Sequence, residues 1–151
     1  MLYFLYGPDT YRSRAKIREI RAEFVKKAGP GAETRRIDAV EELDAVLDAG
    51  RTESLFSKKE LLIIENALSA RAEVSTYIRS MLSRWAADKN LTVIFGEGEI
   101  KAATSGLAKE IIEQAQKVQE FKSLPPASVS RWLLEEAKGR SISISPEELK
   151  L

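Results

Sequence analysis

LYFLYGPD, residues 2–9, is the stretch of sequence that decides the fold. Its first part, Leu2 to Tyr6, is wholly apolar or aromatic, as is typical of a strand buried on both faces of a parallel sheet. Gly7 and Pro8 end that strand. From about Arg12 to Ala28, apolar residues then recur at helical spacing and arginines take the opposite side. A buried strand, a turn and an amphipathic helix predict the first half of a βαβ unit.

The same alternation continues along the chain. Further strands are expected at 33–37, 61–64, 91–95 and 118–121, and helices at about 38–50, 74–85, 107–115 and 129–137. This order predicts a three-layer α/β fold in which a mostly parallel five-stranded sheet carries helices on both faces. Ligands of such folds bind beyond the carboxyl ends of the strands. The loops after Tyr6, Ile64 and Phe95 are therefore where chemistry is expected.

The composition excludes several classes of function. Lys plus Arg (24) nearly equals Asp plus Glu (23), so no global field favours an anionic partner. The chain has no cysteine and no histidine, which removes disulfides, thiolate nucleophiles, the usual zinc ligands and the commonest general base. No apolar run approaches the roughly 18 residues that a membrane span needs. We expect a cytoplasmic protein without a membrane segment, cofactor or metal.

The loop after the first strand does not match the phosphate-binding pattern GxxxxGK[ST]. With Gly7 as the first glycine, Arg12, Ser13 and Arg14 stand where Gly, Lys and Ser/Thr are needed. These losses remove the close backbone approach to phosphate and the magnesium ligand. The strand at 61–64 ends in Glu65-Asn66, where an ATPase would carry an acidic pair. No catalytic residues are therefore assigned.

Two pairs of charged residues near the expected strand ends can be interpreted either as functional sites or as solvated surface side chains. Arg12 and Arg14 lie near a helix N-terminus and suit weak anion binding, but solvated surface arginines are favoured. Glu97 and Glu99 could form a general acid and base, but their place in a glycine-containing turn favours a solvated loop. Glu65 is likewise interpreted as solvated.

Leu55 and Phe56 stand side by side in the polar stretch 52–59. Adjacent residues on a helix point about 100° apart, so both cannot easily face one core. One interpretation is that one of them fills a gap under the sheet. The other is an exposed pair of hydrophobic anchors, which marks a protein interface.

The ordered motifs together resemble the delta subunit of the bacterial DNA polymerase III clamp loader, over essentially the whole chain. They are the opening stretch 2–7, Ser54-Leu55-Phe56-Ser57 running into 61–66, Phe121-Lys122-Ser123-Leu124, and Trp132. The resemblance implies an AAA+ α/β domain at 1–139 and the start of a helical lid domain at 140–151. A helix is also expected to begin at Ser145, so the sequence is interpreted as a fragment of a longer chain, and the resemblance implies that the missing C-terminal part includes a collar domain.

The same resemblance implies a function. Leu55 and Phe56 would enter a hydrophobic pocket on the DNA sliding clamp and open one interface of the ring. The subunit would have no ATPase activity of its own, although it belongs to a polymerase holoenzyme that is a nucleotidyltransferase. Other clamp-loader subunits would join through the missing domain, and DNA would be contacted only weakly or indirectly.

Two alternatives stay open at the level of sequence. One is a divergent P-loop NTPase, which micromolar, magnesium-dependent ATP binding would reveal. The other is a nucleic-acid-binding module that uses the basic helix face of Arg14, Arg18 and Arg21. In that case, duplex binding should fall steeply with salt.

Overall fold

The structure is a computed structural model, which describes residues 1–49, 58–100, 106–145 and 147–149. By its contacts the chain divides into two compact units, Met1–Phe121 and Lys122–Leu151. The larger unit holds the sheet. None of the described helices is long and apolar enough to cross a membrane.

The sheet of the larger unit has five strands, and every neighbouring pair is parallel. Their order across the sheet is β2-β3-β4-β1-β5. The strands are β1 (Leu2–Tyr6), β2 (Glu33–Asp38), β3 (Glu60–Glu65), β4 (Leu91–Gly96) and β5 (Lys117–Glu120). The apolar strands are central and the polar ones, β2 and β5, form the edges, because only central strands are buried on both faces. The predicted fold class is confirmed.

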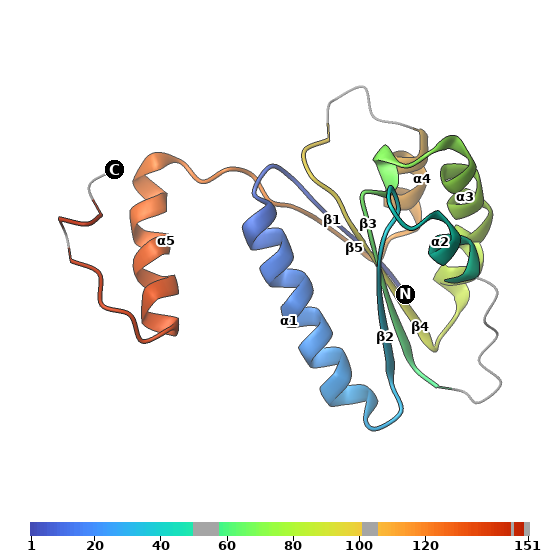
Figure 1. Cartoon of the computed structure of the whole chain (residues 1–151), viewed down its shortest axis with the longest axis horizontal. Coiled ribbons are helices and arrows are strands. Elements are labelled where there is room, and N and C mark those ends of the chain that lie inside the picture. Colours follow the sequence, from blue (N-terminus) through green and yellow to red (C-terminus); the bar gives the residue numbers. More distant parts are fainter. Residues whose placement is uncertain (50–57, 101–105, 146, 150–151) are drawn as a thin grey trace. The chain divides into compact units, whose positions relative to one another are not determined.

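Helices cover both faces of the sheet (Figure 1). One face carries α1 (Thr10–Ala28), which packs Ile17 against Leu5 and Ile94. The other face carries α2 (Leu43–Ala49), α3 (Ala72–Ala87) and α4 (Gly106–Gln114). A 3-10 turn, η1 (Ala67–Ser69), links β3 to α3. The three layers place the loops after β1, β3 and β4 together at one edge.

The larger core lies under α3. The buried residues of α3 recur at helical spacing within the helix that the sequence predicts, and they pack against Phe95 and its neighbours on the sheet; they are Val74, Ile78, Leu82 and Trp85. Burying a large apolar side chain stabilises a fold by about 1.5–3 kcal/mol, so this face contributes most of the hydrophobic stabilisation. The predicted helix is confirmed.

The start of α2 differs from the sequence prediction. In the helix expected at about 38–50, the sequence pattern makes Asp38 the N-cap and puts Val40 on the apolar face with Leu43 and Leu47. In the structure, Asp38 continues β2 and Val40 is 50% exposed. The Asp38 carboxylate accepts a hydrogen bond from the Val40 N–H (2.9 Å), which forms a turn before the helix. The interpretation of Val40 as a core residue is therefore wrong.

The smaller unit contains α5 (Pro126–Gly139). Contacts between residues place α5 in one unit with the residues that follow it, whereas the domain boundary predicted from the sequence falls between residues 139 and 140. The functional domain limits stay a prediction. At Ser145, where the sequence predicts the start of a helix, the Ser145 N–H and hydroxyl both donate to the Glu148 carboxylate (2.8 and 2.9 Å), as in a capping box.

Candidate functional site

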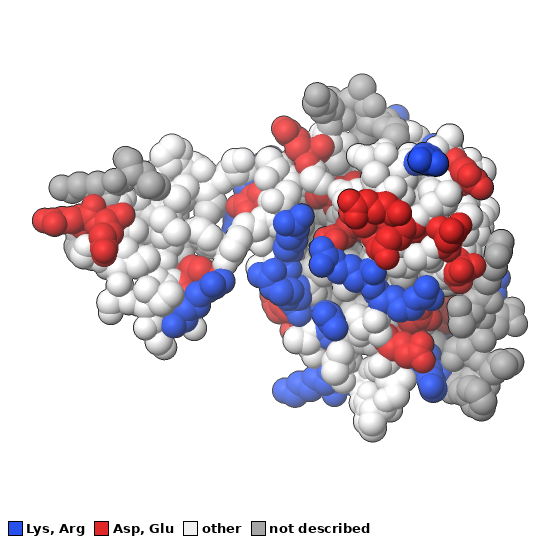
Figure 2. Space-filling model, in the orientation of Figure 1, with Lys and Arg blue, Asp and Glu red and all other residues white. Residues whose placement is uncertain are grey.

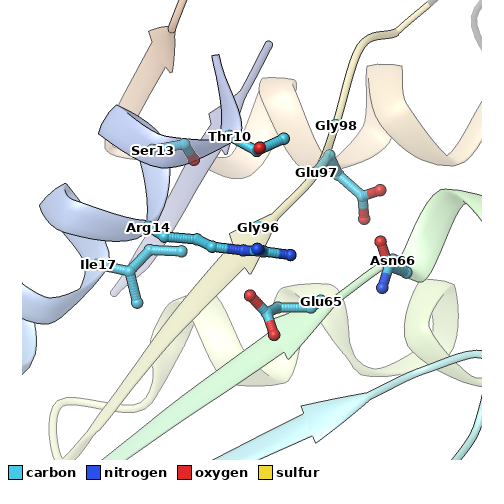
Figure 3. Close-up of a pocket in the computed structure, with 9 residues that line it drawn as sticks. All are labelled: Thr10, Ser13, Arg14, Ile17, Glu65, Asn66, Gly96, Glu97 and Gly98. Atoms are coloured by element: carbon cyan, nitrogen blue, oxygen red, sulfur yellow. The ribbon is translucent and has the colours of Figure 1, made fainter. Parts of the chain in front are cut away.

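A small pocket of about 80 Å³ lies at the carboxyl edge of the sheet (Figure 3). The N-terminal half of α1 and the ends of β3 and β4 supply its walls, as expected for an α/β fold. The lining residues are Thr10, Ser13, Arg14, Ile17, Glu65, Asn66, Gly96, Glu97 and Gly98. The predicted location for chemistry thus coincides with a pocket in the described part of the chain.

The loop after β1 is closed by hydrogen bonds to the backbone of the segments that follow β4 and β5. The Gly7 N–H donates to the Gly98 carbonyl and the Asp9 N–H to the Phe121 carbonyl, both at 3.0 Å. Gly7 has φ +133°, and a Cβ added there would lie 2.4 Å from the Phe121 carbonyl oxygen. Gly7 therefore serves close packing against the end of β5. The N–H groups of Gly7 and Asp9 are therefore occupied by backbone carbonyls and are not free to bind a phosphate.

A carboxylate lies at the N-terminus of α1, where a phosphate would bind in a P-loop protein. Asp9 caps the helix by accepting hydrogen bonds from the Arg12 N–H (3.0 Å) and the Arg12 side chain (2.7 Å). Partial burial opposes its ionisation, but the hydrogen bonds and charge of Arg12 outweigh it and lower the pKa of Asp9. Asp9 is therefore negative at neutral pH and repels an incoming phosphate.

Glu97 is buried within the site, and its side chain turns back toward η1. It is 7% exposed and accepts a hydrogen bond from the Leu68 N–H (3.2 Å). Burial is the main cause that raises the pKa of Glu97 to about 7. The interpretation of a solvated loop is wrong for Glu97, although Glu99 is exposed. No pattern in the sequence distinguishes these two glutamates, because their orientation depends on the turn that follows β4.

The polar side chains at the end of β3 form hydrogen bonds and ion pairs with other residues of the protein. Glu65, whose side chain is 13% exposed, accepts from Arg36 at 2.7 Å (Nε–Oε2), so its interpretation as solvated is wrong. Asn66 adopts a left-handed conformation (φ 59°) and donates to the Asp38 carboxylate at 2.7 Å. The described residues hold no group of three or more acidic side chains placed to bind a metal ion.

Arg14 and Arg12 behave differently in the site. The Arg14 side chain extends from α1 across Gly96, with its guanidinium on the side of Glu65 and Asn66 (Figure 3). Arg12 instead turns toward Asp9. The pocket therefore brings one cation close to two glutamates. It holds neither a nucleophile beside a base nor an open cluster of backbone donors.

Leu55 and Phe56, the sequence candidates for partner binding, lie outside the described residues. Their segment joins Ala49, at the end of α2, to Lys58, which precedes β3 and pairs with Glu33 (3.6 Å). The residues that follow this segment belong to the amino edge of the sheet, whereas the pocket is at the carboxyl edge.

Comparison with solved structures finds proteins of one fold. The DNA clamp loader delta protein YqeN of Bacillus subtilis is similar over 98% of this chain and 46% of its own (TM-score 0.59, 20% identity). The Holliday junction branch migration motor RuvB of Thermotoga maritima matches over 95% and 45% (0.59, 12%). The ORC2 protein of Aeropyrum pernix matches over 91% and 45% (0.57, 10%).

These similarities establish the fold, which is that of AAA+ P-loop NTPases. The chain spans less than half the length of each of these three proteins. No protein-family model matches the sequence, and no curated protein matches it. The chain therefore has an α/β fold similar to that of these proteins, with a closed loop at the place of the phosphate loop.

Proposed function

We propose that the chain is the clamp-binding part of a clamp-loader subunit of the delta type. It would bind a DNA sliding clamp through Leu55 and Phe56 and open one interface of the ring without hydrolysing ATP. The observation that carries the proposal is the loop between β1 and α1, which keeps the AAA+ connection but is closed by Gly7 and Asp9.

A closed loop changes what an AAA+ fold can contribute. An NTPase of this fold aims free backbone N–H groups at its phosphates, while here an ionised carboxylate and two backbone carbonyls take those positions. The fold then serves as a rigid scaffold whose sheet holds other surface segments in place. A subunit that opens a ring by binding energy alone needs such a scaffold and no catalytic centre.

The partner-binding role rests on the sequence of the segment. Leu-Phe within a polar stretch supplies two large apolar side chains, and exposed aromatic or aliphatic anchors dominate binding energies at protein interfaces. The similarity to a clamp loader delta protein supports the same role. Other loader subunits would join through a further domain, and the complex would work in the cytoplasm.

The direct test is binding of the cognate sliding clamp by titration calorimetry, with and without Mg-ATP. We expect saturable binding that is the same in both conditions, because the nucleotide has no place in the pocket. Binding that requires ATP would contradict the proposal, and so would an absence of clamp binding at tens of micromolar protein.

The alternative of a divergent P-loop NTPase is favoured only by the position of the pocket at the carboxyl edge of the sheet. It predicts micromolar ATP affinity that depends on magnesium. The two proposals therefore differ in one inexpensive nucleotide titration.

A further inference from the structure

Arginines gather along one flank of α1, beside the edge strand β2. The positions of Arg14, Arg18 and Arg21 are separated by four and three residues, so they share one side of the helix. Arg14 reaches the end of β3, which places this flank toward β3 and β2. Arg36 projects from the same face of β2, because its sheet partner Ile63 packs in the core under α1. We call these four residues the arginine stripe; Figure 2 shows Lys and Arg side chains in this region.

The other charges of α1 leave the stripe largely uncompensated. Glu19 pairs with Lys16 at 2.7 Å, and Glu23 approaches Lys27 at 4.0 Å. Both lysines lie on the flank of the helix opposite the stripe. Within the described part of the chain, no ion pair is found for the three stripe residues of α1.

Arg36 retains access to solvent despite its pairing with Glu65. Its side chain is 64% exposed, whereas that of Glu65 is 13% exposed. A guanidinium has five donors, so the bond to one carboxylate leaves others for a second anion. The stripe therefore presents four guanidinium groups. Arg14 and Arg36 lie beside the carboxylates of the pocket, and Arg18 and Arg21 form the part of the stripe that extends away from them.

The spacing of the stripe suits a linear, repeating anion. Arg14 and Arg21 are seven residues apart, which is about 10 Å along a helix that rises 1.5 Å per residue. One DNA strand advances 3.4 Å per phosphate, so this length spans about three phosphates. Planar guanidinium groups also bind phosphate oxygens in pairs, which lysines cannot do.

An acidic protein surface fits the stripe less well. Protein interfaces carry large apolar anchors at their centre. The exposed large apolar side chains of α1 are Tyr11 and Val25, at its two ends and away from the centre of the stripe. We propose that the arginine stripe binds the sugar-phosphate backbone of nucleic acid, independently of base sequence.

This function is additional to clamp binding and uses different residues. Sequence-independent contacts of this kind give dissociation constants of about 10⁻⁴–10⁻⁶ M at physiological salt. Such affinity would matter mainly for a protein that is already held close to DNA by a partner. The stripe would then orient the chain on the backbone.

The test compares two double variants of the same helix, Arg18→Gln with Arg21→Gln and Lys26→Gln with Lys27→Gln. Each removes two positive charges from exposed positions of α1, but only the first pair belongs to the stripe. Fluorescence anisotropy with a labelled 20-base-pair duplex and with the single strand would give affinities from 50 to 200 mM salt. Circular dichroism would confirm that both variants keep their helix content.

We expect the arginine variant to bind the duplex at least tenfold more weakly at 50 mM salt. The slope of log affinity against log salt should fall by about 1.8, since each duplex phosphate contact contributes about 0.9. The lysine variant should bind within about twofold of the unaltered protein.

Equal weakening by both double variants would overturn the proposal, because net charge alone would then explain binding. A lack of saturable binding to either nucleic acid at 50 mM salt would also overturn it. Competition by polyglutamate as strong as that by DNA would assign the stripe to an acidic protein instead. Leu55→Ala with Phe56→Ala should leave DNA affinity unchanged, which separates this test from that of clamp binding.

Discussion

At the scale of single residues, Gly7 determines whether the loop after β1 can close. Its positive φ of +133° disfavours any other residue, and the space for a Cβ is filled by the backbone of Phe121. A glycine at this position of an AAA+ fold is expected from phosphate binding. Here Gly7 instead allows the backbone of the loop to pack directly against the backbone of Phe121.

We expect Gly7→Ala to lower the free energy of unfolding by about 2 kcal/mol or more. A strained φ costs about 1–3 kcal/mol, and the contact with Phe121 adds to it. Urea denaturation would measure the change. Gly31→Ala is the matched control, because Gly31 also has positive φ (+96°) but open space around its Cβ position. An equal loss in both variants would contradict the role of the Phe121 contact.

Glu97 gives the protein a specific dependence of stability on pH. Burial raises its pKa to about 7 in the folded state, whereas an unfolded glutamate titrates near 4.5. The folded state thus binds the proton more tightly. This contribution to stability is complete below pH 4.5 and is lost as the pH rises through about 7.

Between pH 5 and 8 this single group should lower the free energy of unfolding by up to about 3 kcal/mol, at about 1.4 kcal/mol per pKa unit. The Glu97→Gln variant keeps a hydrogen-bond acceptor for the Leu68 N–H but cannot titrate. Its stability curve should therefore lack this decline. Parallel curves for the two proteins, measured by denaturation at each pH, would show that Glu97 does not titrate in this range.

At the scale of elements, the connection between β1 and α1 predicts that nucleotide does not bind. Titration of Mg-ATP by calorimetry should give no saturable heat up to millimolar nucleotide, and hydrolysis should stay at background. Placing Gly, Lys and Thr at positions 12, 13 and 14 should not create turnover, because Asp9 still caps α1 and Glu65 still pairs with Arg36. Micromolar ATP affinity of the unaltered chain would contradict this account of the loop.

The elements also show what sequence reasoning can and cannot predict. The apolar runs 2–6, 61–64 and 91–95 identify the central strands, because a strand that is buried on both faces must be apolar along its whole length. The predicted start of the helix at about 38–50 was wrong because one polar side chain forms a turn there, as Asp38 does before Val40. The burial of Glu97 and the pairing of Glu65 with Arg36 depend on contacts between distant segments, which no local pattern encodes.

At the scale of the whole molecule, the end of the chain should contribute little to stability. Deleting residues 141–151 should change the free energy of unfolding by less than about 1 kcal/mol, the usual scale for surface segments. The described residues there are mostly exposed, and Ile142 is 55% exposed. A loss of several kcal/mol in urea denaturation would show instead that this segment packs as part of a core.

The central claim is that Leu55 and Phe56 anchor the protein to a sliding clamp, and the double variant Leu55→Ala with Phe56→Ala tests it most directly. Interface anchors commonly contribute 2 kcal/mol or more, so two should weaken clamp binding at least about a hundredfold. Val40→Ala with Ile112→Ala, which truncates two exposed apolar residues elsewhere, should bind normally.

Clamp affinity and melting temperature measured together distinguish the anchor pair from a core pair. The account predicts lost clamp binding with an unchanged melting temperature in the Leu55→Ala, Phe56→Ala variant. Core residues would instead cost several kcal/mol of folding stability when truncated. A large fall in melting temperature, or clamp binding that survives the double substitution, would contradict the account.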